Sequence, residues 1–202
     1  ITINAGASAT INGTIRAGKQ GGLLGISPTA TTTTVSILFV DAIPNFTLGA
    51  SSLVDYYRQD LTQTVSVLPI GVNYANLTLS ETGCTAATSK VIPTTGITVN
   101  GALTISLAGV AFASTTVNAD KITLGNGATI VRTAGALDAA PTFGSSVNVT
   151  YNGLTAQTAG VEIPSSGLKT LTINNANSVT FSSLTIDSGA SASVLTGSLI
   201  VT

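Results

Sequence analysis

The sequence predicts an all-β protein, most simply a right-handed parallel β-helix, a β-solenoid in which short strands stack coil upon coil. Only 7% of the residues are charged, and β-branched and small residues suited to a pleated surface replace the Lys, Glu and Arg of exposed helix faces. An apolar-Thr-apolar triplet recurs between Gly and Asn-Gly turns. The chain also contains an internal repeat, as solenoids do.

The repeat is a pattern of about 28 residues, found at Ser52–Leu79 and again at Ser146–Ile173. Matching positions are 94 residues apart: Tyr57 and Tyr151, Gln63 and Gln157, and Leu77 and Leu171. We expect the two tyrosines to take equivalent core or corner positions. The spacing divides the chain into a partial first unit at 1–50, a repeat at 51–144 and a partial repeat at 145–202, which can form one continuous domain.

Taken in order, the segments read as strands and turns. Ile1–Ile15 alternates apolar and small polar residues around an Asn-Gly turn, and Gly18–Gly25 predicts a turn between strands. Leu184–Val194 matches the start of the chain position by position. Together with the missing initiator Met, this leads us to expect a processed product or a section of a tandem array.

Almost no helix is expected, because no stretch keeps a 3.6-residue apolar period over about ten positions. The alternative fold is a pair of tandem β-sandwich domains. The repeat spacing is close to the roughly 100 residues of an immunoglobulin-like domain, so the sequence leaves both architectures open.

Composition also excludes several functions. The net charge is -1 with scattered charges, which argues against nucleic-acid binding. No apolar run approaches the ~18 residues of a membrane helix, so we expect no membrane insertion. Without His, Ser-His-Asp catalysis and conventional zinc sites are excluded. Cys84 is the only cysteine, so no internal disulfide can form. We also expect no cofactor and no metal.

Two short patterns resemble motifs of nucleotide binding and of nucleophilic catalysis. Gly13–Gln20 resembles a phosphate-binding loop, but Gln20 lacks the hydroxyl that ligates magnesium. Ser166 and Lys169 have nucleophile-pair spacing, but they occur at a turn entering a strand.

Charged residues gather in the first repeat, at Asp55, Arg58, Asp60 and Glu81. Paired carboxylates could cleave glycosidic bonds. The second copy has uncharged residues at the matching positions, so solvated surface charges are the simpler interpretation. In the second copy itself, Tyr151 and Glu162 occur close together, but Glu162 has no charged counterpart in the first.

Four Asn-x-Thr sequons could accept sugars in an exported protein: Asn12, Asn45, Asn76 and Asn148.

The stretch Tyr151–Gly160, followed by Leu-Lys-Thr-Leu-Thr-Ile-Asn-Asn at Leu168–Asn175, resembles tandem β-repeats of large secreted or surface-attached proteins of Bacteroidota. The resemblance is good from Val147 to Val201 and recognisable from Leu53 to Ile105. The first copy departs from the pattern with Tyr-Arg-Gln at Tyr57. The resemblance implies an extracellular, adhesin-like or filamentous scaffold without catalytic residues.

We therefore expect a structural surface protein, a section of a stalk, adhesin or filament that associates with neighbouring repeats or copies. Glycans or cell surfaces are further expected partners. One alternative is a pilin-like subunit that exchanges its N-terminal strand, in which the exchanged side chains would be those of Ile1, Ile3, Ile11 and Ile15. Another is a carbohydrate-binding or carbohydrate-cleaving β-helix.

Overall fold

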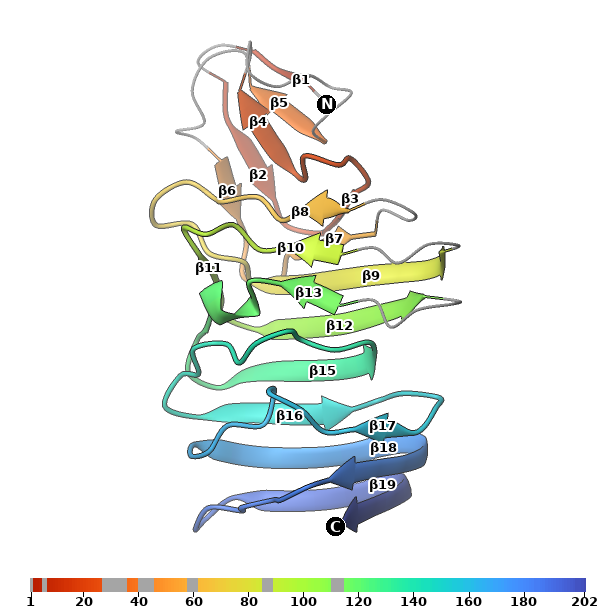
Figure 1. The fold of residues 1–202 in the computed structure, drawn as a ribbon. Helices are drawn as coiled ribbons and strands as arrows, with labels where there is room; N and C mark the ends of the chain where they lie inside the picture. Colours follow the sequence, from red (N-terminus) through yellow and green to blue (C-terminus); the bar gives the residue numbers. More distant parts are fainter. Residues whose placement is uncertain are drawn as a thin grey trace.

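The chain folds as a β-solenoid, as Figure 1 shows. The computed structural model describes residues 2–4, 7–26, 36–39, 46–57, 62–84, 89–109 and 115–202. All strand pairs in these residues run parallel. The predicted all-β solenoid is confirmed, and the parallel pairing excludes the β-sandwich, whose sheets are antiparallel.

One nine-stranded sheet runs from residue 14 to residue 201 and joins residues on both sides of positions 50 and 144. Its strands are β3 (Thr14–Ala17), β7 (Leu53–Tyr56), β9 (Asn76–Cys84), β12 (Ala102–Gly109), β15 (Ala128–Ala134), β16 (Val147–Tyr151), β17 (Gln157–Thr158), β18 (Leu168–Phe181) and β19 (Ser191–Val201). Because β18 and β19 are long, each also continues past the corner of its coil.

Shorter strands form the remaining faces. One face contains β8 (Gln63–Thr64), β10 (Ser89–Val91) and β13 (Thr115–Val117), and another contains β11 (Ile97–Val99) and β14 (Ile122–Leu124). The N-terminal part pairs β1 (Thr2–Ile3), β4 (Leu24–Ile26) and β5 (Ile37–Phe39), and separately β2 (Ala9–Ile11) and β6 (Phe46–Leu48). The short 3-10 turn Ala119–Lys121 is the only helical element among the described residues.

The core consists of columns of inward side chains, one from each coil. The first column contains Val54, Leu77, Leu103, Ile130, Val149 and Leu171, all at most 1% exposed. The alternate residues of each strand face outward, as the period of a β-strand requires. Burying one such side chain contributes about 1.5–3 kcal/mol, so the stack of columns is the main source of stability.

The register of the columns explains the repeat and corrects part of its alignment. Successive column members are 19 to 27 residues apart, and Leu77 and Leu171 are four coils apart. The structural unit is therefore one coil. The second column contains Tyr56 and Tyr151, so the expected equivalence of Tyr57 with Tyr151 is wrong by one residue. Tyr57 instead lies outside, where its ring contacts Arg16.

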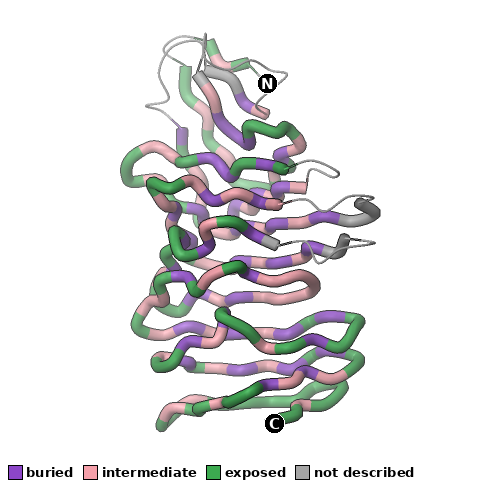
Figure 2. Tube along the Cα trace, in the orientation of Figure 1, coloured by how far each residue is buried: buried purple, intermediate pink, exposed green. Residues whose placement is uncertain are grey.

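The two ends of the solenoid differ. The termini lie at opposite ends of the stack (Figure 1). Near the N-terminus the inward side chains Ala17, Leu23 and Phe46 are at most 1% exposed. The last coil, in contrast, is exposed along almost its whole length, as Figure 2 shows.

Candidate functional site

The strongest candidate site is a buried cluster of ionisable side chains in the C-terminal half. Arg132 of β15 contacts Glu162, which lies between β17 and β18, with Nη1 2.6 Å from Oε1. The Tyr151 hydroxyl donates to the same oxygen at 2.5 Å, and the Gly160 amide donates at 3.1 Å. Glu162 is 1% exposed, so these donors replace the water that Oε1 otherwise requires, whereas Oε2 is buried without a hydrogen-bond partner.

Arg132 is itself well satisfied. Its Nη1 also donates to the carbonyl oxygen of Thr158 at 2.6 Å, and its Nε donates to that of Gly135 at 2.7 Å. Arg132 occupies the second inner column, between Ile105 and Tyr151. The cluster thus connects β15, β16 and the segment between β17 and β18.

The electrostatics of the cluster act on the Tyr151 hydroxyl. Burial raises the pKa of the Tyr151 hydroxyl above its usual range, and the adjacent Glu162 carboxylate raises it further. The hydroxyl therefore remains a proton donor at neutral pH. Because the carboxylate is enclosed, a substrate has no access to it.

A second polar group lies inside the first repeat. Gln63 and Lys90 are register neighbours on β8 and β10, and both are fully buried. The Gln63 amide donates to the carbonyl oxygens of Ala17 and Lys19, at 2.5 and 2.9 Å, and accepts from Lys90 Nζ at 3.0 Å. In the second copy, Gln157 donates to the carbonyl of Arg132 at 3.5 Å. The recurring Gln-Thr pair therefore ties each copy to the backbone of an earlier coil.

The inward tyrosines of the first repeat also bond to each other. The hydroxyls of Tyr56 and Tyr74 are 2.8 Å apart, and Tyr74 donates to the Ser66 carbonyl at 2.6 Å. The Ser66 amide donates to the Tyr56 hydroxyl at 2.9 Å. Burial raises the pKa of both tyrosines.

The structure separates Asp55 from Glu81, two of the carboxylates that could have served a glycosidase. Asp55 points outward from β7, where it bonds Arg16 at 3.0 Å and accepts from the Ser80 hydroxyl. Glu81 is 1% exposed and shares the inner side of β9 with Leu79. The two carboxylates therefore lie on opposite faces of one sheet. Arg58 and Asp60 lie outside the described residues.

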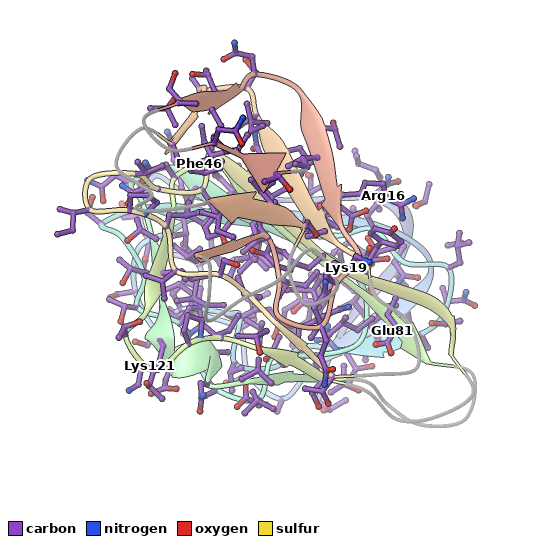
Figure 3. The ribbon with its side chains drawn as sticks, turned by 90° about the horizontal axis from the view of Figure 1, so that it is seen from above. Arg16, Lys19, Phe46, Glu81 and Lys121 are labelled. Atoms are coloured by element: carbon purple, nitrogen blue, oxygen red, sulfur yellow. The ribbon has the colours of Figure 1, made fainter. Side chains whose placement is uncertain are left out.

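Charged groups are also dispersed around the axis. Viewed from above in Figure 3, Lys121 lies on the opposite side of the solenoid from Arg16 and Glu81. Among the described residues, no three His, Cys, Asp or Glu side chains gather as a metal site would require. Four of the surface hollows along the described coils have no Asp, Glu, Lys or Arg in their lining. These hollows therefore offer no charged acid or base to a ligand.

The other sequence patterns fall on ordinary secondary structure. Gly13–Gln20 forms β3 and the turn after it, without the helix that a phosphate loop needs. Ser166 and Lys169 are exposed around the start of β18, and Lys169 does not join the Glu162 cluster. Cys84 ends β9, and its side chain lies outside the described part.

The sequons differ in their surroundings. Asn12 is exposed. The amide nitrogens of Asn76 and Asn148, the atoms to which a sugar would attach, each donate at 3.0 Å to a backbone carbonyl of the preceding coil. Asn45 lies outside the described residues. Among the three described sequons, Asn12 thus remains the most accessible predicted acceptor.

The N-terminal segment pairs within its own chain. Ile3, Ile11 and Ile15 lie on β1, β2 and β3, which pair with β5, β6 and β7. All three side chains are partly buried against the core. Ile1 lies outside the described residues. Strand exchange would require these pairs to open.

The last coil presents an apolar surface that sequence reasoning did not single out. We call the inward side chains of β19, Ala192, Val194, Leu199 and Val201, the terminal apolar face. Val194 follows Ile173 in its column, and Val201 follows Phe181. Ile173 and Phe181 are at most 1% exposed, whereas Val194 and Val201 are 50% and 56% exposed.

Comparison with known proteins gave no match among protein-family models, curated proteins or solved structures. In the described part of the chain, no helix has the length and apolarity of a membrane span.

Proposed function

We propose that this protein is a non-catalytic structural protein of the cell exterior, a section of a surface stalk or adhesin that separates what is attached to its two ends. The observation that supports this role best is the continuous column core with the termini at opposite ends (Figure 1). A chain that enters at one end and leaves at the other works as a spacer. The resemblance of Tyr151–Gly160 to surface repeats supports the extracellular location.

The inner polar groups fit this role. In a solenoid each coil contacts only its neighbours, so stability depends on each interface between coils. The Arg132–Glu162 pair and the Gln63 amide each connect different coils. These contacts resist the separation of coils along the axis.

Single-molecule pulling on residues 1–202 through the two termini tests the proposal. We expect stepwise unravelling in which one coil of 19 to 27 residues releases about 65–95 Å of chain. Collapse in one step at negligible force would contradict a spacer role. Turnover of polysaccharides that is lost in Asp55→Asn would contradict the non-catalytic assignment.

A further inference from the structure

The first repeat encloses a lysine amine beside a side-chain amide. Lys90 on β10 and Gln63 on β8 are register partners in neighbouring coils, and both residues are 0% exposed. Lys90 Nζ donates to Gln63 Oε1 at 3.0 Å. Lysine is almost never fully buried in a folded protein unless it is paired. Here one group in contact with the amine is a primary amide, whose carbonyl carbon an amine can attack.

The preceding coil fixes which end of the Gln63 amide meets the amine. Gln63 Nε2 donates to the carbonyl oxygens of Ala17 and Lys19, at 2.5 and 2.9 Å. Because backbone carbonyls only accept hydrogen bonds, Nε2 must face them and Oε1 must face Nζ of Lys90. A C=O bond is about 1.2 Å long, so Nζ lies within about 4.2 Å of the carbonyl carbon Cδ. A small rotation of the lysine side chain brings Nζ to the attack distance of about 3–3.5 Å.

We propose that Lys90 and Gln63 form an intramolecular isopeptide bond. Nζ of the neutral amine attacks Cδ, the new Nζ–Cδ bond replaces the Cδ–Nε2 bond, and Nε2 leaves as ammonia with one proton from the amine. The products are a secondary amide and ammonia, so the reaction needs no oxidant, reductant or cofactor. The carbonyls of Ala17 and Lys19 are placed to accept hydrogen bonds from the departing nitrogen. Holding the two groups in contact accelerates such a step, and it has to occur only once per chain.

The second copy of the repeat provides an internal comparison. Gln157 has the position that matches Gln63, but its Oε1 accepts from the side-chain amide of Asn175 at 2.7 Å. An amide nitrogen is a poor nucleophile, so Gln157 should stay unmodified. The cross-link at Gln63 would close a loop that pulling on the termini cannot extend, which extends the spacer role. The inference does not rest on that role, because the bond follows from the contact between the two side chains.

Mass spectrometry of the purified and then denatured chain tests the bond. The intact chain should be lighter than its sequence mass by one ammonia. Cleavage after glutamate cuts the chain at Glu81, between Gln63 and Lys90, and again at Glu162. The fragments that contain Gln63 and Lys90 should remain joined after this cleavage. Fragments that separate at their full sequence masses overturn the proposal.

Variants assign the bond to its two residues. Lys90→Met and Gln63→Met should each restore the full mass and release separate fragments. Gln157→Met is the matched control and should keep both the mass deficit and the joined fragments. Fragments that stay joined in Lys90→Met overturn the assignment, and the measurement on the unmutated chain decides the question even where a variant fails to fold. A chain that unravels stepwise under load but lacks the bond rejects this inference alone and leaves the spacer role standing.

Discussion

At the residue scale, the few charged side chains inside the solenoid connect neighbouring coils. Buried ion pairs gain little over apolar residues of equal volume, but breaking one partner away is costly. Glu162 accepts from Arg132, Tyr151 and Gly160. Loss of the Glu162 carboxylate would leave the Arg132 guanidinium, which is only 11% exposed, without its counter-charge.

We therefore expect Glu162→Ala to lower the free energy of unfolding by about 3–5 kcal/mol, measured by urea denaturation. The lower end of this range is favoured because Arg132 keeps two carbonyl acceptors. Asp120→Ala is the control, since the Asp120–Lys121 pair is solvent-exposed and such pairs contribute about 0–1 kcal/mol. Equal effects of the two substitutions would contradict a fastening role for the cluster.

The buried tyrosines should make the fold sensitive to alkali. Burial raises the pKa of Tyr56, Tyr74 and Tyr151 in the folded state, whereas an unfolded tyrosine ionises near pH ~10. Below that pH both states hold the proton and the contribution to stability is complete. Above it, only the unfolded chain loses protons, so stability falls as pH rises toward the folded pKa.

A parallel titration by tyrosinate absorbance and circular dichroism should show these hydroxyls ionising together with the loss of β-structure. Tyr57→Phe, which removes the outward tyrosine, should not change the midpoint of unfolding. Ionisation of the three buried tyrosines within intact β-structure would disprove the prediction.

At the element scale, the strands could be predicted from sequence but the coil could not. The Ile-Thr-Val triplet and its relatives form strands at Ile97–Val99 and Ile122–Leu124, because alternating apolar residues fit a half-buried strand. Coil lengths vary, so no short period is visible, and the 94-residue spacing is the distance across four coils. The extra residue between Tyr56 and Gln63, compared with Tyr151 and Gln157, hid the correct tyrosine pairing.

The ionic cluster was only partly predictable. Tyr151 and Glu162 are close in sequence, but Arg132 reaches them from the preceding coil, and stacking register is a long-range property. The apolar face of β19 was missed because its residues have the same pattern as buried strands. They differ from buried strands only because no further strand pairs with β19 on its outer side.

Close stacking at the coil corners should make one glycine indispensable. Gly197 has φ +77°, and a Cβ there would collide with the carbonyl oxygens of Asn175 and Asn177 in the coil above. Gly71 also has positive φ, at +82°, but faces open space. Gly71→Ala should therefore cost only the left-handed penalty of about 1–2 kcal/mol.

Gly197→Ala should cost more than this, and its effect should be localised. Hydrogen exchange is expected to accelerate in β19 while β12 and β15 stay protected. If both alanine variants lose the same stability in urea, the corner contact does not hold the coils together.

At the scale of the whole molecule, a solenoid of nearest-neighbour contacts has no single core, so its stability varies along the axis. Central strands such as β12 are paired on both sides by β9 and β15, whereas β19 pairs only with β18. At the N-terminal end Ile3, Ile11 and Ile15 are partly buried, whereas Val194 and Val201 at the C-terminal end are half-exposed. Opening should therefore begin at the C-terminal coil.

Hydrogen exchange of the dilute chain should accordingly show protection that is greatest in β9, β12 and β15 and least in β19. Uniform protection along the axis of the dilute chain would show that the coils unfold as one unit, in conflict with stepwise unravelling under load.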